Sequence, residues 1–462
     1  MYFEYIHSEI IDDRIDAQFF TPEYIKSLKK INQFRIETLG NISRRIFDPP
    51  HTAPEFVDKS DFEMIMIENI TLNGIEGNFR AISETCHKDI FKNSHLEGNE
   101  LLVSRVGNSS GTFASVFPCY KGKNVSGNIS IIKLKDEIID KEYAFAYFNS
   151  NIGQNSIKRN IANTARKFLT ISKIREFQVP IPSPEIQKYI GDKVRKAEEL
   201  REEAKRLKKE VLDRLNTLLF NPNIKIDNNK FLYLDCKEII DYKIGATIYR
   251  PKYVSNRRGL KQGIKLLKLK DISRKIYDGN HGSVHPKNIL DEGDIPFIRA
   301  QDAHDGLVEI NKYISNEEYR LLKHKTINYG DIVYGIKGSV GKGGIYLYEN
   351  SDATVNPACV VISPKKLVNS GYLIEVLESD YFNNEIYRFA ESDSTRPQIS
   401  RTEFEELEVP MVSEEEQKAI GDLVFRRIKA INQSKQLIQE AKQDVEDLIE
   451  GNFDMSKVKA NS

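Results

Sequence analysis

The chain contains two collinear copies of one sequence pattern, and this duplication constrains its fold more than any other feature. Three pairs of segments carry it: Glu9–Asp12 and Glu238–Asp241, Ile42–Asp48 and Ile272–Asp278, and Gln187–Asp192 and Gln417–Asp422. The offset between the copies stays close to 230 residues. A unit of this length is too large for a solenoid repeat. The sequence therefore predicts a whole domain, with an attachment, present twice.

Composition limits the classes of protein that need to be considered. The 462 residues include 40% hydrophobic residues, enough for a core in each copy, and 68 basic residues balance 68 acidic ones. A net charge of zero disfavours a non-specific nucleic-acid binder but permits a specific one that segregates charge by face. The cysteines form no CxxC pair, and no signal peptide or membrane span is evident. We expect reduced thiols, no metal site and a cytoplasmic location.

Each copy begins with short apolar runs separated by Gly, Asn and Ser, a pattern typical of strands and turns. The predicted strands are Glu63–Ile67, Leu101–Val106, Ile129–Leu134, Ile295–Ile298, Ile332–Ile336 and Cys359–Ile362. Helices are predicted at Lys141–Asn149 and Ser370–Leu377.

Each copy ends in a long helical pattern with an apolar residue at every third or fourth position. The first follows Ser183-Pro184 and the second begins with the capping box Ser413–Glu416. Each helix of about 33–36 residues is roughly 50 Å long. A lone helix with so narrow an apolar stripe is only marginally stable in water. We expect the two helices to pair as an antiparallel coiled coil. The alternative is that each folds back on its own domain.

The predicted fold is therefore α+β, with two similar domains joined by an antiparallel two-helix coiled coil and pseudo-two-fold symmetry. The predicted boundaries are 1–182 for the first domain, 183–220 for its helix, 221–412 for the second domain, 413–450 for its helix and 451–462 for a tail.

One motif suggests catalysis, but the second copy does not preserve it. Asp48-Pro49-Pro50-His51 resembles the Asp-Pro-Pro-aromatic loop of amino-methyltransferases, whereas Asp278-Gly279-Asn280-His281 lacks both prolines. No Gly-rich strand–turn–helix for a methyl donor accompanies the motif. We interpret it as a turn in which Asp48 and Asp278 hydrogen-bond their own backbone. No convincing catalytic triad or metal-ligand set is present, so no catalytic residue is predicted.

Two glycine-rich loops follow predicted strands. Gly335–Gly344 resembles a phosphate-binding loop, but Ile336 stands where the first glycine belongs and Gly343 replaces the magnesium-binding hydroxyl residue. Ser104–Gly111 is the counterpart in the first copy. Such a loop can offer backbone N–H groups and a cation to a DNA phosphate. A plain hairpin turn is the alternative.

Basic residues concentrate in Ser156–Arg175, and the second copy has a mixed counterpart in which Arg396 matches Arg166. An ordinary solvated surface is the alternative to a DNA contact. The predicted DNA-binding residues are Arg105, Asn108, Ser109, Lys158, Arg159, Arg166, Lys167, Lys337, Ser339, Lys342, Arg396 and Gln398. The candidates for base reading are Asn108, Arg166, Lys337 and Gln398, because Arg suits guanine and Asn or Gln suits adenine.

Taken together, these features make the chain similar to specificity subunits of type I restriction–modification systems. The resemblance covers nearly the whole length. Its carriers are the duplication, the long helices, the Val-Pro pairs at 179–180 and 409–410, the Glu-x-Gln-Lys-x-Ile-Gly-Asp motifs Glu185–Asp192 and Glu415–Asp422, and the run Gly330–Ser339. Ser104–Gly107 departs from the usual spacing of glycines in that run.

The resemblance implies a non-catalytic subunit with two target-recognition domains, each reading half of a bipartite, asymmetric DNA site. It implies helices that act as a spacer and dock two methyltransferase subunits for adenine methylation. A nuclease–translocase subunit would join that complex and cut unmodified DNA in phage defence. S-adenosylmethionine, ATP and magnesium would belong to those partners, and none to this chain. The alternatives are a stand-alone DNA-modifying methyltransferase and a coiled-coil adaptor for proteins.

Overall fold

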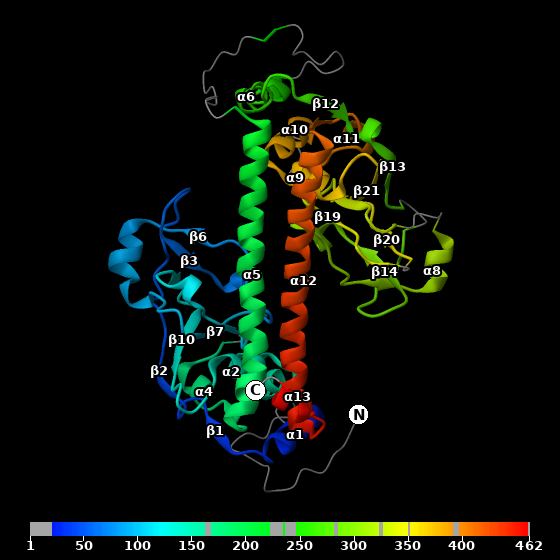
Figure 1. Cartoon of the computed structure of the whole chain (residues 1–462). Coiled ribbons are helices and arrows are strands. Elements are labelled where there is room, and N and C mark those ends of the chain that lie inside the picture. Colours follow the sequence, from blue (N-terminus) through cyan, green and yellow to red (C-terminus); the bar gives the residue numbers. More distant parts are fainter. Residues whose placement is uncertain are drawn as a thin grey trace. The chain divides into compact units, whose positions relative to one another are not determined.

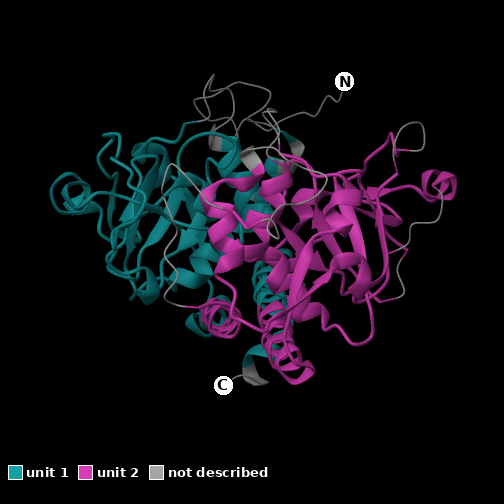
Figure 2. Ribbon diagram, turned by 90° about the horizontal axis from the view of Figure 1, so that it is seen from above, with its two compact units in different colours: residues 1–201, 431–462 teal, residues 202–430 magenta. Residues whose placement is uncertain are grey.

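The computed structural model describes residues 21–161, 168–221, 234–235, 246–280, 285–322, 327–349, 352–390 and 397–460. Two compact units make up the chain: residues 1–201 with 431–462, and residues 202–430 (Figures 1 and 2). The divisions fall inside helices α5 (Pro184–Leu219) and α12 (Glu414–Glu450). Each unit therefore contains about half of each long helix, whereas the predicted domains end where the helices begin.

Unit 1 is built on an antiparallel four-stranded sheet with the order β2-β10-β7-β8. A three-stranded sheet β6-β3-β9 and the pairs β1-β11 and β4-β5 complete its strands. The elements before α5 are α1 (Pro22–Ile31), β1 (Ile36–Thr38), β2 (Ser43–Phe47), β3 (Glu63–Ile65), β4 (Ile70–Thr71), β5 (Gly74–Ile75), β6 (Arg80–Ala81), β7 (Leu101–Ser104), β8 (Phe113–Ser115), β9 (Asn124–Val125), β10 (Ile129–Leu134), α2 (Lys141–Asn149), α3 (Asn151–Ile161), α4 (Ile171–Arg175) and β11 (Gln178–Pro180).

Unit 2 repeats this topology. Its sheet β13-β21-β18-β19 corresponds to β2-β10-β7-β8 and continues into β16 and β15, while β17-β14-β20 and β12-β22 match the smaller sheets of unit 1. The elements before α12 are α6 (Pro251–Arg258), β12 (Lys265–Lys268), α7 (Leu269–Ile272), β13 (Ser273–Asp278), β14 (Ile295–Ile298), β15 (Ala303–His304), β16 (Gly306–Val308), β17 (Tyr313–Ile314), α8 (Asn316–Leu321), β18 (Ile332–Gly335), β19 (Gly343–Ile345), β20 (Thr354–Val355), β21 (Cys359–Pro364), α9 (Ser370–Glu378), α10 (Asp380–Ala390), α11 (Arg401–Glu405) and β22 (Glu408–Met411).

These elements confirm the predicted α+β class and the domain duplication. Strands β10 and β14 and helix α2 have the predicted bounds, and α9 extends one residue beyond its prediction. Strands β7 and β18 stop before their predicted ends, because the chain there turns into the glycine loops. No helix in the described ranges combines the length and apolarity needed to cross a bilayer.

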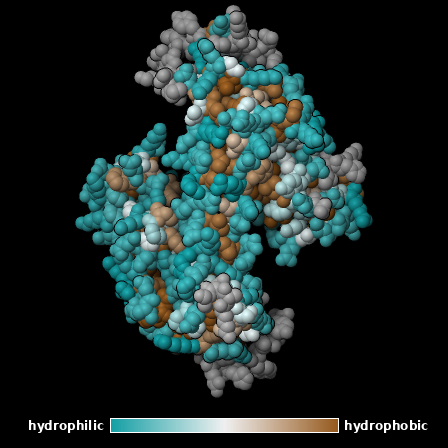
Figure 3. Space-filling model, viewed as in Figure 1, coloured by the Kyte–Doolittle hydropathy of each residue, from teal (hydrophilic) through white to brown (hydrophobic). Residues whose placement is uncertain are grey.

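The long helices run antiparallel to one another within each unit. In unit 1, Val194 of α5 and Val445 of α12 belong to one buried core cluster, and Lys193 Nζ lies 2.6 Å from Asp444 Oδ2. In unit 2, Arg214 pairs with Glu416 at 2.8 Å and Glu203 with Arg426 at 3.3 Å. Hydrophobic residues gather along the line of these helices in Figure 3. The same core cluster of unit 1 also includes residues of α2, so the two helix segments of unit 1 pack on the rest of that unit as well as on each other.

The Gln-Lys-x-Ile-Gly-Asp motif docks helix α2 onto α5. Asp140 caps α2 by accepting hydrogen bonds from the N–H groups of Glu142 and Tyr143. Gln187 Oε1 accepts a hydrogen bond from the Asp140 N–H at 2.8 Å. A Cβ at Gly191 would collide with Asp140 Oδ1, so only glycine allows this close approach.

Unit 2 uses the same arrangement with an amide in place of the carboxylate. Asn369 caps α9, and Gln417 Oε1 of α12 accepts a hydrogen bond from the Asn369 N–H at 3.3 Å. A Cβ at Gly421 would collide with the Asn369 side chain. The motif seen in the sequence is therefore a helix-docking device, which explains its presence in both copies.

We predict that burial along the helix pair in unit 1 contributes strongly to stability. Ile438, 1% exposed, packs in that core, so Ile438→Ala should lower the free energy of unfolding by about 2–5 kcal/mol. The exposed Gln443 on the same helix provides the control, and Gln443→Ala should change it by less than about 0.5 kcal/mol. Equal effects in denaturant titrations would contradict the packing of α12 against this core.

Candidate nucleic-acid interface

In unit 2 the structure brings the glycine loop next to residues within the counterpart of the basic segment. The loop leaves β18, and the Gly335 N–H donates to Lys342 O at 2.8 Å. Lys337 and Gln398 form an isolated antiparallel bridge, supported by a 3.0 Å hydrogen bond from Ile399 N–H to Ile336 O. Lys342 and Gln398 are exposed, whereas Lys337 is half-buried. A cation and an amide therefore share one surface.

Unit 1 has the same pairing between its glycine loop and residues within the basic segment Ser156–Arg175. Val106 bridges Phe168, and the Leu169 N–H donates to Arg105 O at 2.9 Å. Within the loop, the Gly111 N–H donates to Ser104 O at 2.8 Å. The glycine loops and the basic segments were predicted independently of each other. The structure shows that each loop pairs with the basic segment of its own unit.

The predicted contacts at the tip of the unit 1 loop lie at the surface. Asn108 is exposed, and Ser109 is half-buried with its hydroxyl 3.0 Å from the Ser104 hydroxyl. Gly107 and Gly111 have φ values of 73° and 90°, in the left-handed region that favours glycine. In unit 2, Ser339 is half-buried in the matching loop. Glycine thus shapes both loops so that their polar side chains reach solvent.

Arg105 lies inside unit 1, not on its surface. It is 4% exposed, with Nη1 2.5 Å from Asp48 Oδ2 and Nε donating to Leu169 O at 2.9 Å. Its guanidinium lies 4.7 Å from the centre of the Phe168 ring. Burial lowers the pKa of Arg105, and the Asp48 carboxylate opposes that shift. This side chain ties the glycine loop to the residues at 168–169.

The interpretation of Asp48 as a turn residue bonded to its own backbone is wrong. Its side chain binds Arg105 and accepts a hydrogen bond from the Ser130 hydroxyl at 2.6 Å. His51 Nε2 lies 4.0 Å from Asp48 Oδ2, the oxygen that also pairs with Arg105, and the His51 side chain is exposed. The Asp-Pro-Pro-His motif therefore supports a buried ion pair under the loop.

The remaining predicted residues divide into two groups. Lys158 and Arg159 lie in the last turn of α3, where Lys158 is exposed and Arg159 is half-buried. Arg166, Lys167 and Arg396 lie outside the described residues, as does His281. The described chain resumes at Phe168 and Pro397, beside the glycine loops.

A side chain beneath each glycine loop differs between the units. In unit 1, Asn149 Oδ1 accepts from the Phe113 N–H at 3.1 Å and Asn149 Nδ2 donates to Phe113 O at 2.8 Å. In unit 2 the corresponding group is Glu378, which accepts from the Gly343 N–H at 3.0 Å. Burial and the nearby Glu375 carboxylate raise the pKa of Glu378 to about 7. Below that pH a protonated Glu378 carries a donor and an acceptor, as the amide of Asn149 does.

Sequence analysis did not identify Glu378 or Asn149 as residues that support the loops. Both lie at the end of a predicted helix and differ in side chain, so the repeat alone gives no sign of a shared role. An alignment of the two copies could have found them, because Asn149 and Glu378 are the last residues of the equivalent helices α2 and α9.

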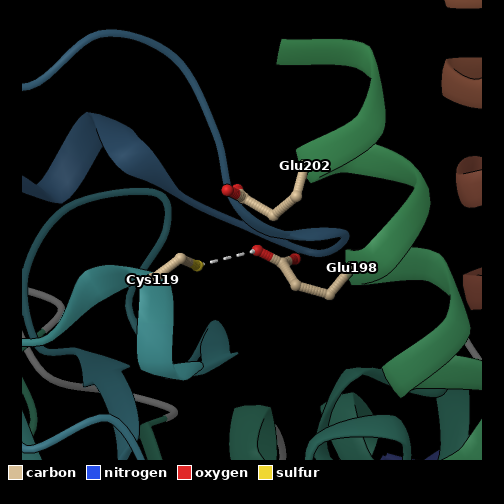
Figure 4. A group of neighbouring side chains, drawn as sticks. All are labelled: Cys119, Glu198 and Glu202. Atoms are coloured by element: carbon tan, nitrogen blue, oxygen red, sulfur yellow. Dashed lines mark hydrogen bonds between the residues drawn. The ribbon is translucent and has the colours of Figure 1, made fainter. Parts of the chain in front are cut away.

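One group of side chains in the described part of the chain has metal-ligand chemistry: Cys119, Glu198 and Glu202 (Figure 4). The Glu198 carboxylate already accepts hydrogen bonds from the Tyr120 hydroxyl at 2.8 Å and from Arg201 Nη1 at 3.1 Å. Cys119 Sγ lies 3.8 Å from the same carboxylate. The Tyr120 hydroxyl and the Arg201 guanidinium thus already bind the buried Glu198 carboxylate.

Comparison with known proteins gives two matches to one family model. Residues 29–214 and 261–443 each match the type I restriction modification DNA specificity domain. Among solved structures, a type I restriction–modification S subunit from M. genitalium is 16% identical, with 91% of this chain and 96% of that chain covered and a TM-score of 0.45. An HsdS subunit from Thermoanaerobacter tengcongensis is 14% identical, with 91% and 97% covered and a TM-score of 0.31.

We predict that Glu378 makes stability depend on pH near neutrality. Its folded-state pKa of about 7 lies above the ordinary value of 4.5, so the fold favours the protonated form. The stabilisation is complete below pH 4.5 and is lost as the pH rises through 7. Glu378→Gln should therefore melt at a higher temperature than the unchanged protein at pH 8, with the difference vanishing towards pH 4.5.

The reciprocal change in unit 1 provides the control. Asn149→Asp places a titratable group under the other loop and should lower the melting temperature more at pH 8 than at pH 5. A Glu378→Gln protein with the pH profile of the unchanged chain would contradict this explanation.

Proposed function

Since the chain belongs to the type I restriction modification DNA specificity domain family, we propose that it reads a bipartite DNA target as a specificity subunit. The observation that carries the proposal is the pairing of a glycine loop with residues within a basic segment or its counterpart, repeated in both units. A framework used twice suits a partner that presents two related sites. Double-stranded DNA with two half-sites is such a partner.

The polar groups on these loops suit both kinds of DNA contact. Exposed Lys342 can bind phosphate as a cation, and backbone N–H groups of a glycine loop can do the same. Gln398 and Asn108 carry the amide that pairs with adenine in the major groove. Because the loops present different side chains in the two units, we propose that the half-sites differ and the target is asymmetric.

Arg105 has a different role in this proposal. Its buried guanidinium holds the loop against Phe168 and Leu169, so it supports the reading surface from within. The DNA contacts of unit 1 then come from Asn108, Ser109 and the cations of α3. Arg166, Lys167 and Arg396 stay candidates for contact because their neighbours at 168 and 397 adjoin the glycine loops.

We further propose that catalysis resides in partner subunits. The long helices expose charged residues such as Arg206, Lys209 and Glu210 opposite their buried stripes, and these faces suit the docking of two methyltransferase subunits and a nuclease–translocase subunit. S-adenosylmethionine, ATP and magnesium would then be bound by those partners. Adenine methylation in this arrangement requires a partner that flips the base out of the stack.

Domain exchange tests the assignment of one half-site to each unit. Replacing residues 1–182 by the same region of a relative with a known target should change one half of the methylated sequence and leave the other half intact. Sequencing of methylated DNA from cells that express the chimera with its methyltransferase reads the result. A change in both halves would contradict two independent readers.

Single substitutions on the unit 2 loop test the proposed contacts. Gln398→Ala should weaken binding by about 1–3 kcal/mol and relax the preference at one base pair, because a bidentate base contact is lost. Lys342→Ala should weaken binding to all sequences and reduce the salt dependence by about one phosphate contact. Titrations of labelled duplexes with the assembled complex at several salt concentrations separate these two effects.

Lys366 is an exposed lysine of unit 2 away from the loop and serves as the matched control. Lys366→Ala should leave affinity and salt dependence unchanged. If Gln398→Ala and Lys342→Ala both bind like Lys366→Ala, the glycine loop of unit 2 is not the DNA surface.

A further inference from the structure

Both units contain an Asx-Gly turn that is bound by an arginine from a long helix. In unit 1 the turn joins β4 to β5 through Asn73 and Gly74, and Arg201 of α5 donates to Asn73 O. In unit 2 the turn joins β15 to β16 through Asp305 and Gly306, and Arg427 of α12 donates to Asp305 O at 3.1 Å. The two turns lie in Ile70–Asn99 and Ala300–Tyr329, regions in which the two copies differ in sequence.

The other long helix supplies a second cation to each turn. In unit 1, Lys442 of α12 donates to Leu72 O at 3.3 Å. In unit 2, Lys208 of α5 forms an ion pair with the Asp305 carboxylate. Each turn is therefore held by one basic residue from α5 and one from α12, with the helices exchanging roles between the units.

The glycine in each turn is what lets the arginine come so close. A Cβ at Gly74 would lie 2.7 Å from Arg201 Nη1, and a Cβ at Gly306 would lie 2.7 Å from Arg427 Nη2. The φ values of these glycines are 127° and 77°, which other residues rarely adopt. Each turn thus has a glycine without a side chain at the point where the guanidinium approaches.

A carboxylate completes each arrangement. Arg201 Nη1 lies 3.1 Å from Glu198 Oε2 on its own helix, and Arg427 Nη2 pairs with Glu375 of α9. Glu375 adjoins the sheet that carries the glycine loop, because α9 also contains Glu378, which binds Gly343. In unit 2 the helix arginine is therefore linked through α9 to the proposed reading surface.

We propose that Arg201 and Arg427 are positioning residues for target reading. Within its own unit, each arginine binds the Asx-Gly turn and so fixes the sheets of that unit to its segments of the two long helices. The inference rests on the proposed function and names the residues on which the tolerated spacing between half-sites depends. Each turn binds one basic residue from α5 and one from α12, so it is attached to both helix segments of its unit at the same place. If one of these basic residues is lost, the sheets stay attached to the helix segments through the hydrophobic core but can tilt more freely relative to them.

The environment of Arg427 does not favour the stability of the fold. It is 1% exposed, and in the described part of the chain its Nε and Nη1 atoms have no hydrogen-bond partner. Buried donors without partners oppose folding, and apolar replacements of buried charged groups are often tolerated. A role in orientation explains why an arginine, not a methionine, occupies this position.

The expected consequence is a loss of spacer discrimination. One extra base pair rotates one half-site by roughly 34° relative to the other and moves it by about 3.4 Å. A unit held firmly cannot follow that displacement, whereas a unit freed at its turn can follow part of it. Arg427→Met should therefore broaden the tolerated spacer while the bases read in each half-site stay the same.

The test uses the full chain expressed with its methyltransferase partner in cells that carry a plasmid library. The library contains the recognised target, first identified by sequencing methylated DNA, with its natural spacer and with one base pair added or removed. We expect the preference for the natural spacer over the altered ones to fall about tenfold in Arg427→Met and Arg201→Met, the scale of one lost charged contact. Lys366→Met, which replaces an exposed lysine of unit 2 outside both long helices, should keep the full preference.

Three further outcomes separate the possible explanations. An unchanged spacer preference in folded Arg427→Met and Arg201→Met overturns the inference. If these variants fail to fold, judged by melting curves, the milder Lys208→Met takes their place, and an unchanged preference in it overturns the inference equally. A wild-type chain that directs no sequence-specific methylation overturns the proposed function, whatever the variants do.

Discussion

The structure depends on the burial of two narrow apolar stripes, one on each long helix. Neither helix is stable alone at this composition, and each covers its stripe partly with the other helix and partly with the domain beside it. This double use explains why Gln187 and Gly191 recur at the same points in the second copy. They secure the capped end of a domain helix against the long helix, so the core of the domain and the helix pair form together.

The repeat allowed much of the fold to be predicted. The short apolar runs form strands that occupy equivalent places in the sheets of the two units. Where the predictions failed, the cause was a long-range contact. Arg105 was predicted as a surface cation because it stands at the start of the Ser104–Gly111 loop, yet its contacts with Asp48 and Leu169, which are distant in sequence, keep it buried.

The candidate site was predictable at the level of segments and less so at the level of side chains. The glycine loops and the basic segments were both recognisable, because clusters of glycine and of basic residues can be seen directly in the sequence. Their pairing through Val106 and Phe168, or Lys337 and Gln398, is a tertiary contact that no local pattern encodes. The same holds for Asn149 and Glu378, whose common role emerges only when the two units are compared side by side.

Comparison of the two units also separates framework from variation. The docking of α2 and α9, the bridge beside each glycine loop and the arginine at each Asx-Gly turn occur twice, in side chains that are often not identical. The loop tips carry different polar residues and are exposed. Groups that occur twice therefore hold the surface in place, and groups that differ give each surface its chemistry. A chain built in this way can change what one unit binds by altering a few exposed residues, while the buried contacts that orient both units stay the same.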